Sequence, residues 1–211
     1  DEYPNLDEVD AIVMTGSKHN SFEDRPWINR LVEYTKKAIA HDHVKVLGIC
    51  FGHQIIGRAF SVKVGRSELG WEISVSEVDL TEQGKKLFGK DKLVRRLQVF
   101  YASRKDLDVN DLQRIQQMHQ DIVFECPSNV IPLGSSPLCA VQGMYVPGKF
   151  ISVQGHPEYS EFIVSEIIKV RTKTGLFTGE QSADALRRVG NEHDGVEIGK
   201  VFLNFLLDEK A

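Results

Sequence analysis

Cysteine is scarce in this sequence, and long apolar runs are missing from it. The three cysteines, Cys50, Cys126 and Cys139, are odd in number and unevenly spaced, which argues against a disulfide framework and against a CxxC metal site. Free thiols are typical of a reducing compartment, so we expect a cytoplasmic protein, with the nucleus as the alternative. No apolar stretch approaches the roughly 20 residues that cross a bilayer, so we expect no membrane partner.

An excess of positive charge is also absent. The chain has 26 Lys and Arg against 30 Asp and Glu, which gives a net charge of −4. Nucleic acids and anionic lipids attract basic surfaces, so we expect neither as a partner. The 211 residues suffice for one α/β domain with a sizeable core but are few for two. We therefore expect a single domain over residues 1–211.

Apolar strand patterns and amphipathic helix patterns alternate along the chain. Strand patterns cover residues 9–17, 44–50, 71–80 and two segments of 140–155 that flank a Pro-Gly turn. Helix patterns cover residues 26–40, 52–60, 160–171 and 195–207. This order predicts an α/β fold with a mainly parallel sheet covered by helices, in which residues 9–17 form an interior strand.

One charged stretch, from Lys90 to Gln117, has no clean strand period. Long excursions of this kind are usually surface features, so we predict a surface insertion over residues 90–117. The alternative is a lid over a pocket.

The stretch LGICFGHQ, residues 47–54, places Cys50 between Gly48 and Gly52 at the end of an apolar run. A buried core cysteine is one interpretation, since free cysteine often packs as a small hydrophobe. The other is a nucleophile on a sharp strand-to-helix turn, where neighbouring glycines avoid steric overlap and the helix N-terminus favours a thiolate. The position at a strand end favours the nucleophile, because α/β sheets bind ligands there.

A thiolate nucleophile needs a base and an orienting partner. His156 is the best candidate among seven histidines, because it follows the strand pattern FISVQG and precedes Pro157, which favours extended backbone. Residues two apart in extended chain point the same way, so His156 and Glu158 are expected to project together. Alternatively, Glu158 is a surface residue at a helix start.

The two motifs GICFGHQ and QGHPEYS together resemble the class I (triad) glutamine amidotransferases, and the similarity extends over nearly the whole chain. The form QGHPEY is similar to a stand-alone branch that includes γ-glutamyl peptidases. The resemblance implies a flavodoxin-like three-layer αβα fold and an enzyme without a metal or organic cofactor. It implies Cys50 as nucleophile, His156 as base and later acid, and Glu158 as the residue that orients His156.

The resemblance also implies further site residues. The oxyanion hole would use the Phe51 amide and an amide of the Gly16–Ser17 loop, where Lys18 replaces the proline common in the family. Gln54 would contact the substrate.

The implied reaction is attack on the γ-carboxamide of glutamine or on a γ-glutamyl amide, through a γ-glutamyl thioester. The substrate would be a small molecule, and ammonia could pass to a synthase partner chain. The alternatives are a free-standing γ-glutamyl peptidase acting on glutathione-like conjugates and a non-catalytic interaction or redox-sensing member. Family members have a strand–helix unit before the strand that residues 9–17 resemble, so we expect this chain to be N-terminally incomplete.

Overall fold

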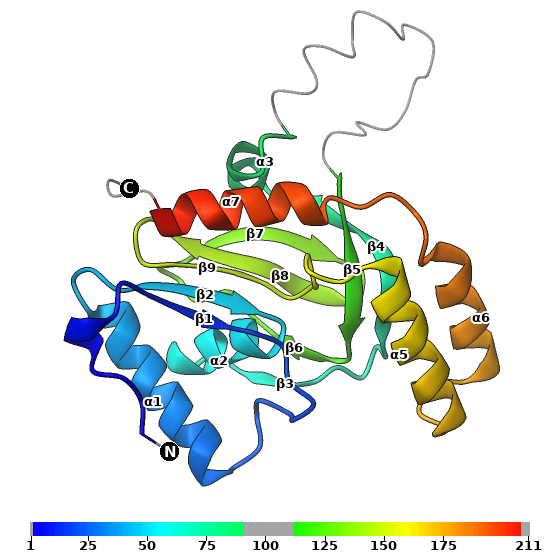
Figure 1. Cartoon of the computed structure of the whole chain (residues 1–211), viewed down its shortest axis with the longest axis horizontal. Coiled ribbons are helices and arrows are strands. Elements are labelled where there is room, and N and C mark those ends of the chain that lie inside the picture. Colours follow the sequence, from blue (N-terminus) through cyan, green and yellow to red (C-terminus); the bar gives the residue numbers. More distant parts are fainter. Residues whose placement is uncertain (1, 91–111, 208–211) are drawn as a thin grey trace, which may run out of the picture.

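A computed structural model of the chain describes residues 2–90 and 112–207 (Figure 1). The strands are β1 (Ala11–Met14), β2 (Lys45–Ile49), β3 (Val64–Arg66), β4 (Glu72–Leu80), β5 (Leu112–His119), β6 (Asp121–Val123), β7 (Ile131–Ser136), β8 (Cys139–Val146) and β9 (Phe150–Val153). The helices are α1 (Pro26–Ala40), α2 (Phe51–Ala59), α3 (Glu82–Leu87), α5 (Glu161–Lys173), α6 (Gly179–Arg188) and α7 (Gly195–Leu207), and a 3-10 turn covers Leu6–Glu8. None of these helices is long and apolar enough to cross a membrane.

Seven of the strands form one mixed sheet in the order β1-β2-β9-β8-β7-β4-β5, while β3 and β6 pair separately. The β1–β2 and β2–β9 ladders are parallel, and the ladders from β9 to β5 are antiparallel. The expected parallel arrangement therefore describes the half of the sheet at β1, β2 and β9. The antiparallel half includes the β8–β9 hairpin, whose tight turn at Gly148 has a positive φ of 67°.

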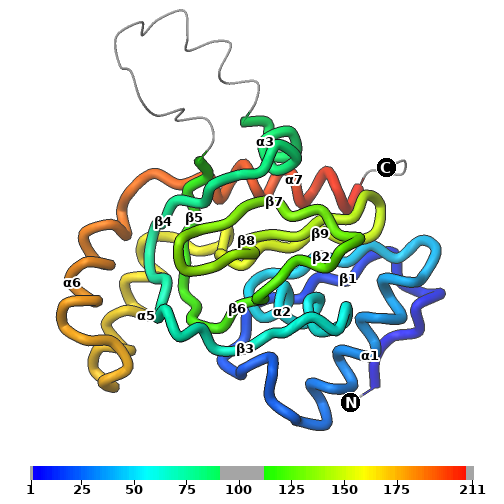
Figure 2. The backbone as a smooth tube through the Cα atoms, turned by 180° about the vertical axis from the view of Figure 1, so that it is seen from behind, coloured from blue at the N-terminus to red at the C-terminus, as the bar shows by residue number. Residues whose placement is uncertain are grey.

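Helices cover both faces of this sheet, which confirms the predicted three-layer α/β fold (Figures 1 and 2). Successive residues of β2 point to opposite faces, so Val46 packs with α1 and α2 whereas Leu47 packs with α7. Phe150 and Ile151 of β9 divide between the two faces in the same way. A third apolar cluster joins α5 and α6 to Ile73, near the start of β4, and to Met118, near the end of β5.

β1 is an edge strand, and this differs from the interior position predicted for residues 9–17. It pairs with β2 on one side, and no strand within residues 2–90 or 112–207 pairs with its other side. Met14 is buried, but the Val13 side chain is 53% exposed. Of these two residues, only Met14, at the end of β1 that leads to the Gly16 loop, is packed as in an interior strand.

The proposed insertion at residues 90–117 needs correction at its end. Residues 112–117 are the first part of β5, which pairs with β4 along its whole length and is mostly buried. Their buried glutamines disguise the strand in a hydropathy pattern. Lys90 is held by an ion pair with Asp194, at 2.7 Å. Residues 91–111 lie outside the described part of the chain.

Candidate active site

Cys50 occupies the sharp turn between β2 and α2. Its backbone has φ 51° and ψ −100°, a conformation that is strained for a residue with a side chain. Two hydrogen bonds hold it there: the Cys50 amide donates to the Val153 carbonyl at 2.9 Å, and the Gln54 amide donates to the Cys50 carbonyl at 3.0 Å. The surrounding fold therefore fixes a strained cysteine at the carboxyl end of the parallel strands.

The flanking glycines are sterically required at this turn. A β-carbon on Gly48 would lie 2.8 Å from the backbone of Gly52, and a β-carbon on Gly52 would overlap the Met14 carbonyl. Both contacts are shorter than real β-carbons make, so neither position accepts a side chain without a shift of the backbone. The GxCxG spacing thus allows β1, β2 and α2 to meet closely beneath the sulfur.

His156 and Glu158 project together, as the sequence predicted. The distance from His156 Nδ1 to Glu158 Oε1 is 2.8 Å, and the imidazole is buried while the carboxylate is half-exposed. The ring of Tyr159 stacks on the imidazole with 3.9 Å between centroids and 4° between planes. The His156 amide donates to the Gln116 carbonyl of β5 at 2.8 Å. These contacts orient the ring and leave Nε2 as the nitrogen available to Cys50.

Electrostatic coupling links Cys50 to His156. Burial lowers the pKa of His156, but hydrogen bonds to the Cys50 and Glu158 side chains and the charges of both groups raise it to about 9. The imidazole is therefore protonated at neutral pH beside the sulfur. By contrast, burial raises the pKa of the Cys139 thiol to about 12 and also raises that of Cys126, so both thiols are poor nucleophiles.

Two of the predicted oxyanion residues, Phe51 and Gly16, lie beside Cys50 and His156. Phe51 is the first residue of α2, and the helical hydrogen bonds begin only with the Gln54 amide, so the Phe51 N–H stands outside that series. A β-carbon on Gly16 would lie 2.8 Å from His156 Cε1, which places the Gly16 backbone against the imidazole edge. Ser17 is exposed, and its hydroxyl accepts a hydrogen bond from the His19 amide at 3.1 Å.

Gln54 anchors the Gly16 loop to the body of the domain. Its side-chain oxygen accepts from the buried Ser21 hydroxyl at 2.9 Å. Its amide nitrogen donates to the Asp121 carbonyl at 2.8 Å and to Gln154 Oε1 at 3.1 Å. A direct contact between Gln54 and substrate would have to replace one of these bonds, so its predicted binding role stays a prediction.

The other histidine of the motif, His53, is structural. Its two ring nitrogens contact the Ser152 hydroxyl at 2.9 Å and the Val141 carbonyl at 3.2 Å. Complete burial and the nearby charge of His119 lower its pKa to about 3, although the bond to Val141 opposes this shift. His53 is therefore neutral, points away from the sulfur turn and does not act as the base.

A family model described as glutamine amidotransferase class-I matches residues 2–162. The chain belongs to the class I glutamine amidotransferase family. A glutamine amidotransferase-like protein of Schizosaccharomyces pombe is 35% identical over 99% of this chain and 75% of its own length. Gamma-glutamyl peptidase 3 of Arabidopsis thaliana is 36% identical over 77% of this chain, and the match spans 60% of that protein. The chain thus matches only part of the length of these relatives.

Solved structures agree on the fold of this amidotransferase domain. A glutamine amidotransferase from Thermotoga maritima superimposes with a TM-score of 0.73 over 99% of this chain and 83% of its own, at 18% identity. A glutamine amidotransferase from Methylobacillus flagellatus gives a TM-score of 0.70 over 98% of this chain and 77% of its own, at 19% identity.

Two features near Cys50, His156 and Glu158 were not predicted from the sequence. Tyr159 stacks on His156. The only signal in the sequence that could have indicated this contact is the position of the tyrosine three residues after the histidine. Arg171 of α5 packs against Trp71 and Phe177, which belong to the same apolar cluster as Tyr159. No local pattern marks that arginine, because its neighbours come from distant segments.

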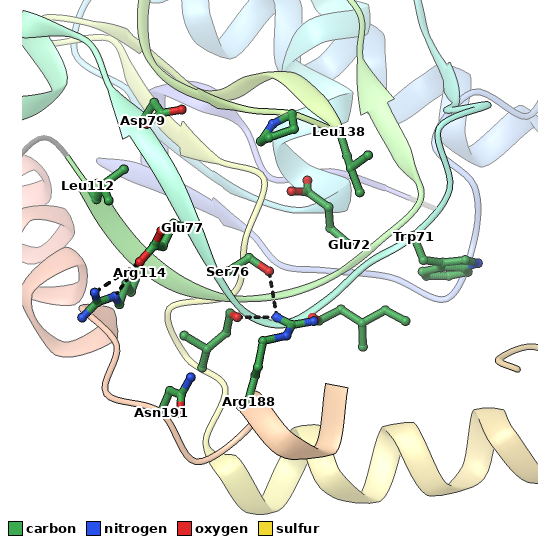
Figure 3. Close-up of a pocket in the computed structure, with 13 residues that line it drawn as sticks. Trp71, Glu72, Ser76, Glu77, Asp79, Leu112, Arg114, Leu138, Arg188 and Asn191 are labelled. Carbon is green, nitrogen blue, oxygen red and sulfur yellow. Dashed lines mark hydrogen bonds and ion pairs between the residues drawn. The ribbon is translucent and has the colours of Figure 1, made fainter. Parts of the chain in front are cut away.

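A cavity of about 590 Å³ lies apart from the triad, beside β4, β5 and the end of α6 (Figure 3). Its two arginines are engaged with protein. Arg114 pairs with Glu77 at 3.2 Å, and Arg188 donates to the Ser76 hydroxyl at 3.3 Å. Cys50, His156 and Glu158 are not among its lining residues, so this cavity lies outside the candidate active site.

No group of three His, Cys, Asp or Glu side chains in residues 2–90 and 112–207 is arranged to hold a metal ion.

Proposed function

We propose that this domain hydrolyses a γ-glutamyl amide through a thioester on Cys50, with His156 as the base and acid and Glu158 as the orienting carboxylate. The observation that carries the proposal is the coupling of three groups at one strand end: the strained Cys50, the imidazole bonded to it, and the carboxylate 2.8 Å behind that imidazole. Nucleophile, base and orienter are the parts that acyl transfer requires.

The proposed reaction has two halves. The Cys50 thiolate attacks the γ-carbonyl carbon, and the resulting oxyanion is held by the Phe51 amide and an amide of the Gly16–Ser17 loop. The C–N bond then breaks as His156 delivers its proton to the departing ammonia or amine. In the second half, His156 accepts a proton from water, which attacks the thioester carbon. The C–S bond then breaks, glutamate is released and the Cys50 thiolate is restored.

Two observations support a hydrolytic rather than a non-catalytic member. The strained backbone at Cys50 costs roughly 1–3 kcal/mol of stability, and a purely structural cysteine would give no reason for this strain. Gamma-glutamyl peptidases 3 and 4 of Arabidopsis thaliana are 36% and 31% identical to this chain. The three free thiols also support the proposed cytoplasmic location.

The alternative is a glutaminase that passes ammonia to a separate synthase chain. One experiment separates the possibilities: the chain is incubated with glutamine and with γ-glutamyl dipeptides, with Cys50→Ala as control. Release of glutamate and the free second amino acid from the γ-glutamyl dipeptides supports the hydrolase. Turnover of glutamine alone, stimulated by a second protein, would support the ammonia donor. No turnover of any γ-glutamyl amide would refute the proposal.

A further inference from the structure

Arg171 presents hydrogen-bond donors that nothing in the described part of the chain accepts. Its Nη1 atom is buried without a hydrogen-bond partner, and no ion pair joins the guanidinium to any residue in these ranges. A buried donor without an acceptor costs roughly 1–3 kcal/mol, and more when it is charged. A buried donor of this kind calls for an explanation, and an acceptor supplied by a bound ligand is one.

Two aromatic rings hold this guanidinium in place. Arg171 Cζ lies 5.0 Å from the centre of the Trp71 ring and 5.6 Å from that of Phe177. The two rings themselves meet edge-on, with centroids 5.1 Å apart. Stacking of this kind restrains the guanidinium through its faces and leaves its N–H edge free. The arginine is therefore pre-oriented although no acidic side chain in residues 2–90 or 112–207 pairs with it.

The same guanidinium is electrostatically close to the nucleophile. Burial, the larger effect, lowers the pKa of Arg171, whereas its electrostatic interactions with Tyr159 and Cys50 raise it. Reciprocally, Arg171 opposes the burial that raises the pKa of Tyr159, whose ring stacks on His156. Geometry links the two sites as well: Trp71 and Phe177, which hold Arg171, belong to the same apolar cluster as Tyr159, whose ring stacks on His156.

We propose that Arg171 binds a carboxylate group of the substrate during turnover. Guanidinium is the side chain whose planar donors match a carboxylate in two parallel hydrogen bonds. The inference deepens the proposed function and rests on it for the identity of the substrate. A γ-glutamyl substrate offers two such groups: the α-carboxylate of the glutamyl unit and the terminal carboxylate of a leaving amino acid or peptide.

The first experiment does not depend on turnover. Cys50 is alkylated with iodoacetate, which carries a carboxylate, and with iodoacetamide, which is neutral, and its modified peptide is quantified by mass spectrometry. We expect the rate ratio of iodoacetate to iodoacetamide to fall about tenfold in Arg171→Met and to be intermediate in Arg171→Lys. Lys169→Met is the matched control, because it removes one exposed positive charge from the same helix.

A ratio in Arg171→Met that equals that of the wild type and of Lys169→Met would overturn the assignment. Thermal unfolding of each variant identifies any loss of fold. If Arg171→Met does not fold, Arg171→Lys is used instead, because it retains the stem and the charge but loses the planar fork. An unchanged ratio in that variant would also overturn the assignment.

The second experiment assigns the carboxylate. Kinetics of wild type and Arg171→Lys are compared on glutamine and its α-amide, and on γ-glutamylglycine and γ-glutamylglycinamide. An increase in KM of about tenfold confined to substrates with a free α-carboxylate assigns Arg171 to the glutamyl unit. An increase confined to γ-glutamylglycine assigns it to the leaving group. Equal effects on every member of both pairs would contradict carboxylate binding.

The two proposals fail differently. If the wild type cleaves none of these amides, the proposed function is wrong, and the alkylation ratio still decides whether Arg171 attracts a carboxylate to Cys50. If the wild type cleaves them and Arg171→Met or Arg171→Lys behaves like Lys169→Met in both experiments, the function stands and the role of Arg171 is wrong.

Discussion

Gly16 lies directly against the edge of the His156 imidazole. A methyl group in place of its hydrogen would sit 2.8 Å from Cε1, and the remaining ring contacts prevent an easy retreat. We therefore predict that Gly16→Ala displaces the imidazole from Cys50 and lowers kcat/KM at least tenfold, which corresponds to about 1.4 kcal/mol of lost transition-state stabilisation. The melting temperature should change little, because Gly16 belongs to a partly exposed loop.

The matched control is Gly199→Ala in α7. Apart from the backbone of its own helix, no heavy atom of the described residues lies within 4 Å of the position that its β-carbon would take. Alanine is also the better helix former by roughly 0.5–1 kcal/mol, so this variant should keep full activity and gain slight stability. If Gly16→Ala retained wild-type kcat/KM, the contact between the loop and the base would have no catalytic importance.

Cys50→Ala should abolish turnover and leave the fold intact, because the sulfur is the only atom lost from the turn. Cys126→Ala and Cys139→Ala should retain activity, although Cys139→Ala should cost about 1 kcal/mol of stability since Cys139 is fully buried. The measurements are γ-glutamyl amide hydrolysis and thermal unfolding for each variant. Activity in Cys50→Ala, or inactivity of a folded Cys126 or Cys139 variant, would exclude Cys50 as the nucleophile.

Glu158 and His156 should differ in what their removal leaves behind. If Glu158 only orients and supports the imidazolium, Glu158→Gln should retain more kcat than His156→Ala, by about tenfold or more, because the amide still contacts Nδ1. Single-turnover kinetics on the same amide would measure the difference. Equal loss in both variants would mean that Glu158 has a further role, such as a direct substrate contact.

The pKa of His156 predicts a pH-dependent stability. The folded pKa is about 9 and the ordinary value is 6.5, so the protonated imidazole stabilises the fold fully below pH 6.5 and this contribution is lost as the pH rises to about 9. A shift of this size corresponds to about 3 kcal/mol for a side chain this deeply buried. Urea unfolding from pH 6 to 10 should show the decline.

Cys50→Ala provides the comparison for that titration. It removes one of the two partners that raise the pKa of His156, so the decline should become smaller and shift toward lower pH. A stability that stays constant across pH 6.5–9 in the wild type, or a decline unaffected by Cys50→Ala, would contradict the proposed coupling.

The parts of the site that the sequence predicted share a local cause. Gly48, Cys50 and Gly52 lie within one turn, and His156 and Glu158 are two residues apart in extended chain, so spacing alone places these side chains. The alternating strand and helix patterns predicted the three layers for the same reason. Backbone periodicity records which face of an element is buried.

Features that depend on distant segments were missed. β5 was missed because Gln113, Gln116 and Gln117 are buried in it, so its burial does not appear as a hydrophobic pattern. Hydrogen bonds to the Val189 carbonyl and to Gln142 accommodate the side chains of Gln116 and Gln117. The exposed edge of β1 could not be read from an apolar run that looks the same for edge and interior strands. Arg171 escaped because Trp71 is a hundred residues away from it in sequence.

The enclosure of the His156 imidazole limits how protons can move. Tyr159 lies flat on one face, Glu158 holds Nδ1, Gly16 meets Cε1, and the backbone is bonded to Gln116. A ring so confined cannot turn over between the two halves of the reaction. The nitrogen that serves Cys50 must therefore also serve the leaving amine and then the incoming water, so these three partners have to occupy the same small volume in succession. Departure of the amine becomes a precondition for hydrolysis, and a slowly released amine would act as a product inhibitor of the second half-reaction.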